Sequence, residues 1–290
     1  MREKITNLFK EYYGNNAKFR EGQLEAIEST YLNPKTLVVQ KTGWGKSLVY
    51  FLSTKLFRSE GRGMTLVVSP LLVLMENQKD AANKLKIRCA CLNSLVKKEN
   101  RSSLINDIVK DNYDLVFITP ENLFKPDVQE ALPNINISLF VIDEAHCISD
   151  WGHDFRLEYG KLNKVLKRLP DSVHVLGTTA TANDRVVNDL KEQLGNNVFI
   201  SRGSLTRESL IICNVELHDT ASRYAWILKN INKLPGSGII YCLTQKDCDY
   251  LANFLCENGI SARAYYSKNE EGEMENQHII KVYMDVLISN

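Results

Sequence analysis

The stretch QKTGWGKS at residues 40–47 contains the residue types of a phosphate-binding loop. An apolar run at 36–39 precedes it, and a segment with helical potential follows it. In such a strand–loop–helix unit, backbone N–H groups and the positive end of the helix hold phosphates, a lysine adds charge and a hydroxyl binds Mg²⁺. The predicted nucleotide-binding residues are Thr42, Gly43, Trp44, Gly45, Lys46 and Ser47.

Two residues depart from the usual form of this loop. Gln40 replaces its opening glycine, and Trp44 lies between its two glycines. A side chain at Gly45 would block the approach of phosphates, whereas the side chain of Trp44 can point away while its N–H points in. The loop remains a candidate phosphate site, with a surface loop before an amphipathic helix as the alternative.

An acidic pair, Asp143 and Glu144, follows an apolar run at 139–142. Open α/β folds bind their ligands at the carboxyl ends of such strands. One carboxylate can hold Mg²⁺ through water, and the other can orient and deprotonate an attacking water molecule. A solvated turn is the alternative, but the joint presence of this pair and the glycine-rich loop favours a catalytic nucleotide site.

Apolar runs that alternate with longer amphipathic segments must position these groups. Runs that begin near 36, 65, 114, 139 and 173 are predicted strands, and stretches such as 71–86 and 158–169 are long enough to be crossover helices. This alternation predicts a parallel sheet with helices on both faces.

The alternation begins again after the charged stretch 201–209. Strands are predicted at 211–217, 238–243 and 260–266, with helices between them. We therefore expect one domain over 1–205 and a second over 206–290. The second is shorter than a typical domain and is expected to be incomplete.

Composition restricts the class of protein without identifying it. The 290 residues are 44% hydrophobic and 24% charged, with a net charge of +1, so nucleic-acid binding would depend on local patches. The seven cysteines form no CxxC pair and are expected to be buried thiols of a reducing compartment. No signal-peptide pattern or long apolar window is present, which predicts a cytoplasmic protein without membrane partners.

The chain contains an ordered series of motifs, of which DEAHCISDWGHDFR at 143–156 is the most specific. The others are FREGQ at 19–23, TGWGKS at 42–47, VVSPLLVLMENQ at 67–78, ITPENL at 118–123 and TTATAND at 178–184. This series resembles that of RecQ-type superfamily 2 DNA helicases, in which a DEAH box is joined to an aromatic-rich loop. The resemblance implies an α/β fold of two RecA-like lobes with parallel sheets flanked by helices, the second lobe incomplete.

The resemblance also implies roles for individual residues. ATP and Mg²⁺ are the expected cofactors, with adenine read by Phe19, Arg20 and Gln23. Lys46 would contact phosphate, Ser47 and Asp143 would hold Mg²⁺, and Glu144 would be the catalytic base. The residues expected to couple the nucleotide to DNA are His146, Thr179 and Thr181.

Single-stranded and duplex DNA are the implied partners, and no protein partner is indicated. Aromatic side chains can stack on bases of a single strand without regard to sequence, although they could instead be core anchors. The predicted DNA-binding residues are Trp151, His153, Phe155 and Arg156 in the aromatic-rich loop and Ser69, Asn93 and Thr119 at strand ends.

Two other interpretations concern the same region. A zinc site would use His146, Cys147, Asp150, His153 and Asp154, but their spacing matches no standard ligand pattern. The basic residues Lys161, Lys164, Lys167 and Arg168 could contact DNA or form a solvated helix face.

The implied function is ATP-dependent DNA unwinding coupled to translocation along a single strand. A nucleotide-gated DNA-binding module that does not unwind is the alternative. Two departures bear on this choice: the segment 264–272 differs from the usual family pattern, and the last two helicase motifs, one with an arginine that faces ATP, are expected beyond Asn290.

Overall fold

The computed structural model describes residues 1–290 except 150–159, 196, 206–210, 235, 265–281 and 285–290. The chain divides into two compact units, Met1–Ser209 and Leu210–Asn290, and each is described by itself. No helix among the described residues is long and apolar enough to cross a membrane.

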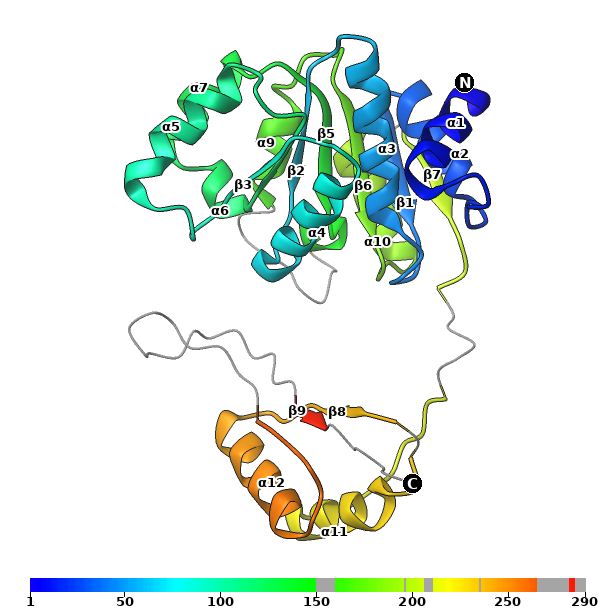
Figure 1. The fold of residues 1–290 in the computed structure, drawn as a ribbon, viewed down its shortest axis with the longest axis vertical. Coiled ribbons are helices and arrows are strands. Elements are labelled where there is room, and N and C mark those ends of the chain that lie inside the picture. Colours follow the sequence, from blue (N-terminus) through cyan, green and yellow to red (C-terminus); the bar gives the residue numbers. More distant parts are fainter. Residues whose placement is uncertain (150–159, 196, 206–210, 235, 265–281, 285–290) are drawn as a thin grey trace. The chain divides into compact units, whose positions relative to one another are not determined.

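A seven-stranded sheet with all strand pairs parallel forms the centre of the first unit, in the order β3-β4-β2-β5-β6-β1-β7 (Figure 1). The runs predicted near 36, 65, 114, 139 and 173 are confirmed as strands β1, β2, β4, β5 and β6. The strands are β1 (Lys35–Val39), β2 (Met64–Val68), β3 (Cys89–Leu92), β4 (Leu115–Ile118), β5 (Ile137–Asp143), β6 (His174–Thr179) and β7 (Phe199–Arg202).

Helices cover both faces of this sheet, because alternate strand residues point to opposite sides and are apolar on both. One face packs on α1 (Arg2–Tyr13), α2 (Gln23–Leu32), α3 (Lys46–Ser59) and α4 (Leu72–Lys84). The other face packs on α5 (Lys98–Val109), α6 (Pro120–Leu123), α7 (Pro126–Ala131), α9 (Leu162–Leu166) and α10 (Asp184–Leu194). Two short 3-10 helices, η1 (Leu132–Asn134) and η2 (Ala145–Ile148), complete this unit's described elements.

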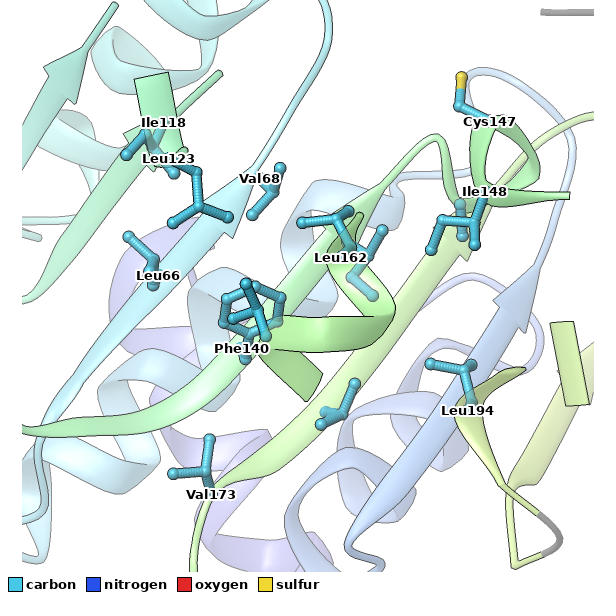
Figure 2. Packing of buried hydrophobic residues seen from close by; sticks show 14 of the residues in the cluster. Leu66, Val68, Ile118, Leu123, Phe140, Cys147, Ile148, Leu162, Val173 and Leu194 are labelled. Carbon is cyan, nitrogen blue, oxygen red and sulfur yellow. The ribbon is translucent and has the colours of Figure 1, made fainter. Parts of the chain in front are cut away.

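The core of the second face fixes the end of β5, where the acidic pair lies. Figure 2 shows Leu66 and Val68 of β2 in the same buried cluster as Phe140 of β5 and Ile148 of η2. Phe140 is fully buried and Ile148 is 1% exposed. The segment that follows Asp143 is therefore held against the sheet by apolar packing.

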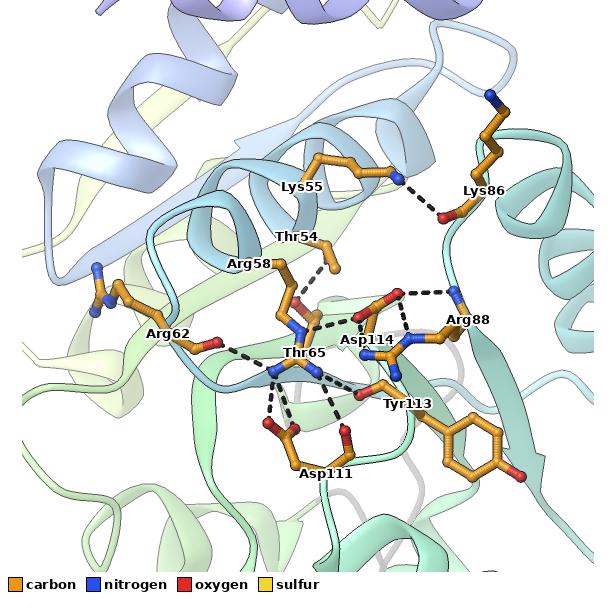
Figure 3. A network of polar contacts seen from close by, with 10 residues as sticks. All are labelled: Thr54, Lys55, Arg58, Arg62, Thr65, Lys86, Arg88, Asp111, Tyr113 and Asp114. Carbon is orange, nitrogen blue, oxygen red and sulfur yellow. Dashed lines mark hydrogen bonds and ion pairs between the residues drawn. The ribbon is translucent and has the colours of Figure 1, made fainter.

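A network of polar contacts anchors the C-terminal end of α3 (Figure 3). The guanidinium of Arg58 donates to both carboxylate oxygens of Asp111 and, at 2.9 Å, to Asp114. The Arg88 guanidinium donates to both oxygens of the Asp114 carboxylate, at 2.7 Å to Oδ1 and 3.2 Å to Oδ2. These partners precede β3 and β4, so the network ties the end of α3 to the start of two strands.

The described part of the second unit contains α11 (Thr220–Ile231), β8 (Gly238–Ile240), α12 (Gln245–Glu257) and β9 (Val282–Met284). A small apolar cluster that includes Leu251 and Leu255 joins its two helices. The strand predicted at 211–217 is wrong, because these residues form no strand, and Ile211 is 95% exposed. A strand needs a neighbour for its backbone groups, and no described strand pairs with this segment. The pair β8–β9 is antiparallel rather than parallel.

Candidate functional site

The glycine-rich loop connects β1 to α3, as predicted from the sequence. Gly43 has a φ of 82° and Gly45 a φ of 96°, conformations that side-chain-bearing residues rarely adopt. A Cβ atom on Gly45 would lie only 2.7 Å from the Gln23 side-chain nitrogen. The left-handed backbone and the nearby Gln23 side chain therefore both favour glycine at position 45, in addition to the expected approach of a phosphate.

Lys46, the first residue of α3, directs its ammonium group back over the loop. Nζ donates to the backbone carbonyl of Gln40 at 3.0 Å and to that of Lys41 at 3.5 Å. The positive charge thus lies at the helix N-terminus, inside the curve of the loop. Both features favour an anion, so the residues present fit a phosphate group.

Ser47 lies beside buried polar atoms that sequence reasoning missed. Gln78 of α4 donates from Nε2 to the Ser47 hydroxyl at 3.4 Å. Gln78 Oε1 is buried without a hydrogen-bond partner. Burial raises the pKa of Tyr50 well above its ordinary value, nearby Asp143 adds to this effect, and the Ser47 hydroxyl opposes it. Unpaired buried polar atoms are uncommon and suit a site that receives a hydrated ion.

Asp143 is the last residue of β5 and is 6% exposed. Its Oδ1 accepts a hydrogen bond of 2.7 Å from Thr178 of β6, and its Oδ2 accepts one of 3.4 Å from Ser69. Burial raises the pKa of Asp143, the Glu144 carboxylate raises it further, and Thr178 and Lys46 act in the opposite direction. Because a cation would stabilise the charged form, the carboxylate environment fits Mg²⁺.

Glu144 follows directly with a φ of 50°, in the left-handed region. Non-glycine residues adopt this conformation infrequently, and such residues cluster at functional sites. Its carboxylate lies 3.3 Å from His146 Nδ1. The backbone conformation thus turns Glu144 out of the strand and towards the histidine.

His146, Thr179 and Thr181, the three expected coupling residues, are brought together by the structure. His146 Nδ1 lies 3.0 Å from the Thr179 hydroxyl, which also accepts from the backbone N–H of Thr181 at 3.2 Å. Burial acts to lower the pKa of His146, but the Cys147 and Glu144 side chains outweigh it and raise it to about 10. A continuous polar chain therefore runs from Glu144 to the segment after β6.

A cavity of about 230 Å³ opens among these groups. The residues that line it come from the glycine-rich loop, the segment after β2, the acidic segment and the segment after β6. They are Thr42, Pro70, Leu71, Glu144, His146, Cys147, Ala180 and Thr181. The carboxyl ends of four strands thus converge on one space, where α/β folds bind ligands.

The segment predicted to read adenine lies beside the glycine-rich loop. Phe19 stacks on Phe9 of α1, with ring centroids 4.0 Å apart, and Arg20 is exposed. Gln23 is 4% exposed, and both ends of its amide already bond to backbone. Its Oε1 accepts from Arg20 N–H and its Nε2 donates to the Trp44 carbonyl, each at 2.7 Å. Contact of these residues with a base stays a prediction.

The residues predicted to contact DNA at strand ends are buried. Ser69 is fully buried beside Asp143, and Asn93 is 1% exposed. Thr119 is 4% exposed and its hydroxyl caps α6 by accepting from the Asn122 N–H. These side chains shape the strand ends, and their contact with DNA stays a prediction.

The aromatic-rich loop falls outside the described residues. This concerns Trp151, His153, Phe155 and Arg156, and also Asp150 and Asp154 of the alternative zinc interpretation. Among the residues that the structure does describe, no group of three or more His, Cys, Asp or Glu side chains could hold a metal ion. Lys161, Lys164, Lys167 and Arg168 on and around α9 are all exposed.

Residues 20–190, more than half of the chain, match the family model described as DEAD/DEAH box helicase. The chain belongs to the DEAD/DEAH box helicase family. This DEAD/DEAH box helicase chain also has relatives that carry RecQ-type names, which confirms the resemblance recognised in its motifs.

Three relatives illustrate the similarity. The probable ATP-dependent DNA helicase RecS of Bacillus subtilis is 35% identical, over 98% of this chain and 57% of its own length. The ATP-dependent DNA helicase RecQ of the same organism is 33% identical, over 92% of this chain and 44% of its own length. A putative ATP-dependent DNA helicase Q1 of Caenorhabditis briggsae is 37% identical, over 90% of this chain and 43% of its own length. The DEAD/DEAH box chain thus spans about half the length of these curated relatives.

A solved structure shows the same fold. S. cerevisiae Dbp5 bound to RNA and ADP BeF3 matches this DEAD/DEAH box chain with a TM-score of 0.67. The match covers 87% of the chain and 64% of Dbp5, at 18% sequence identity. The predicted fold class, α/β with RecA-like helicase lobes, is confirmed at this level.

Proposed function

We propose that this chain is part of an ATP-dependent DNA helicase of RecQ type, which couples ATP hydrolysis to translocation along a single strand and to duplex separation. The observation that carries the proposal is the meeting of Lys46, Asp143, Glu144 and His146 at one edge of the sheet. The RecQ-type names of the relatives support DNA as the substrate.

ATP with Mg²⁺ is the cofactor that the residues fit. The N–H groups of the loop and the Lys46 ammonium would hold phosphates, and Ser47 and Asp143 would hold Mg²⁺. When bound, Mg²⁺ neutralises charge that develops on the phosphates. Glu144, turned out of β5, would accept a proton from the attacking water.

The polar chain from Glu144 gives the protein a means to relate nucleotide state to DNA. His146 contacts both the Glu144 carboxylate and the Thr179 hydroxyl, so a change at the carboxylate alters the partners of the residues after β6. Single-stranded DNA would contact the aromatic-rich loop that follows η2 in sequence.

The experiment compares this chain, which spans about half the length of the curated relatives, with a version extended by about 150 residues, the size of one typical domain. DNA-stimulated ATP hydrolysis and duplex separation are measured at equal concentrations, with Lys46→Ala as the inactive control. A matched control is Lys98→Ala, at an exposed lysine of α5. We expect the extended chain to hydrolyse ATP and to separate duplex DNA. Lys46→Ala should lose both activities, and Lys98→Ala should keep both.

Two results would count against the proposal. ATP-dependent DNA binding without separation by the extended chain would favour the nucleotide-gated binding module instead. Hydrolysis that is as fast in Lys46→Ala as in the wild type would remove the phosphate-loop assignment altogether.

A further inference from the structure

The two unusual residues of the glycine-rich loop turn towards the same neighbour. Gln40 and Trp44 are each 6% exposed. A Cβ atom placed on Gly22 would lie 3.8 Å from Gln40 Nε2 and 3.8 Å from Trp44 Cζ2. Gly22 precedes α2 and has a φ of 77°. Gln40 and Trp44, the two departures from the usual loop sequence, therefore both lie near the turn at Gly22, about 20 residues earlier in the chain.

Hydrogen bonds join the same two segments in both directions. The indole Nε1 of Trp44 donates to the Glu21 carbonyl at 2.9 Å. The Trp44 carbonyl accepts from Gln23 Nε2 at 2.7 Å, and Gln23 Oε1 accepts from the backbone of Arg20, also at 2.7 Å. Trp44 thus contacts the 20–23 turn through its side chain and through its backbone.

The environment of the indole shows that it does not serve as a phosphate ligand. Trp44 belongs to the buried cluster formed by α1 to α4 and one face of the sheet. Its ring is directed into this cluster, while the glycines on either side of it, Gly43 and Gly45, shape the loop. A phosphate role for position 44 is limited to its backbone.

Gln40 extends the same contact to a third segment. The N–H of Gly203, just after β7, donates to the Val39 carbonyl at 3.1 Å. A Cβ atom on Gly203 would overlap Gln40 Oε1, at 2.3 Å. Gln40 therefore lies against glycines of two segments, one before α2 and one after β7.

We propose that Trp44 and Gln40 are positioning residues that fasten the 20–23 turn to the phosphate loop, so that purine recognition and phosphate binding form one unit. This inference rests on the proposed ATP function. Within that function, Trp44 and Gln40 would determine which base the site prefers. The indole fixes the Glu21 carbonyl, and the Trp44 carbonyl fixes the orientation of the Gln23 amide. A turn that is ordered before binding loses less entropy when a base arrives.

The test separates base recognition from phosphate recognition. Binding of ATP, GTP and inorganic tripolyphosphate, each with Mg²⁺, is measured by calorimetry for the wild type and for Trp44→Phe. Phenylalanine keeps an aromatic ring in the cluster but has no N–H to donate to Glu21. A matched control is Trp226→Phe, at a half-exposed indole of the second unit.

For Trp44→Phe we expect ATP affinity to fall about two- to tenfold, the effect of one net hydrogen bond. Tripolyphosphate affinity should stay within about twofold, because the loop backbone and Lys46 remain. The ratio of ATP affinity to GTP affinity should become smaller than in the wild type. Trp226→Phe should keep the wild-type affinities for all three compounds. Gln40→Gly, which restores the common opening residue, should reduce ATP binding in the same selective way.

Other outcomes overturn the inference. An equal loss of ATP and tripolyphosphate affinity would mean that Trp44 only shapes the phosphate loop, and unchanged ATP and GTP affinities would mean that the indole contact has no role in binding. A wild-type chain that binds none of the three compounds would refute the proposed function itself. Melting curves of Trp44→Phe and the wild type are also compared. A partly unfolded variant would melt earlier and would lose affinity for all three compounds.

Discussion

The hydroxyl of Thr178 donates a 2.7 Å hydrogen bond to Oδ1 of Asp143 across the boundary between two parallel strands. Thr178 is fully buried and lies on β6, which separates β5 from β1. This threonine was not among the residues predicted for the site. Thr178 pairs in register with Asp143 of β5 on one side and with Val38 of β1, the strand that leads into the glycine-rich loop, on the other.

Thr178→Val should weaken the use of Mg²⁺. Valine has the shape of threonine without the donor, so Asp143 loses a bond that favours its charged form, worth about 1 to 3 kcal/mol. We expect the Mg²⁺ concentration required for half-maximal ATP hydrolysis to rise. Thr65→Val, at a buried threonine of β2 that bonds Thr54, is the control and should keep the wild-type requirement. Identical Mg²⁺ curves for both variants would contradict this role of Thr178.

Lys46→Ala and Trp44→Gly should differ sharply. Removal of the Lys46 ammonium deletes the charge inside the loop and should abolish tight ATP binding or turnover. Trp44→Gly leaves the backbone N–H in place, so turnover at saturating ATP should stay within about tenfold, or ~1.4 kcal/mol. Steady-state hydrolysis measures both, and equal damage from the two changes would show that the wrong atoms have been assigned to the phosphate cradle.

The aromatic residues Trp151 and Phe155 are predicted to stack on bases. Alanine at either position should weaken single-strand binding by about 1 to 3 kcal/mol and reduce the stimulation of ATP hydrolysis by DNA, with ATP binding unchanged. Fluorescence anisotropy with a labelled oligonucleotide measures the first effect. Tyr250→Ala, at an exposed aromatic of α12, is the control. A variant that melts far below the wild type would favour the alternative in which these rings are core anchors.

Acid should weaken the network at the end of α3. Burial acts to raise the pKa of Asp114, but hydrogen bonds from Arg88 and Arg58 outweigh it and lower the pKa to about 2 from an ordinary value of 3.8. A depressed folded-state pKa contributes stability above the unfolded value and loses it as the pH falls through the folded one. Over the window from about pH 4 to about pH 2 we therefore expect a loss of about 2 kcal/mol in the free energy of unfolding.

Denaturant unfolding at a series of pH values measures this loss. Asp114→Asn should be less stable than the wild type at pH 7, and the difference between them should shrink in the acid range. Asp171→Asn, at an exposed aspartate, is the control and should follow the wild-type curve. A constant difference between Asp114→Asn and the wild type at every pH would rule out the linkage.

The central strands could be predicted from the sequence because they are buried on both faces and read as continuous apolar runs. No residue range was predicted for the edge strands β3 and β7, although Asn93, which follows β3, was expected at a strand end. Each of these strands has one neighbour, and β7 contains the polar residues Ser201 and Arg202. The error at 211–217 has the opposite cause, since its apolar residues suggest a strand that finds no described partner.

The site divides in the same way. Lys46, Asp143 and Glu144 follow strands directly, so local sequence order indicates their place. Thr178 and Gln78 act through partners on other elements, and nothing in their own sequence neighbourhood reveals those contacts. Trp44 was recognised as unusual, but its bond to Glu21 depends on how α2 packs beside the loop.

The anchoring of α3 by Arg58 has a consequence for motion at the opposite end of the helix. A helix whose last turn is bonded to Asp111 and Asp114 cannot slide along its axis without breaking those bonds. Any rearrangement of the loop during nucleotide exchange must then come from changes in the backbone torsions of residues 40–45, because the helix keeps its position. Amide protons in the middle of α3 should accordingly exchange with solvent equally slowly whether or not nucleotide is present.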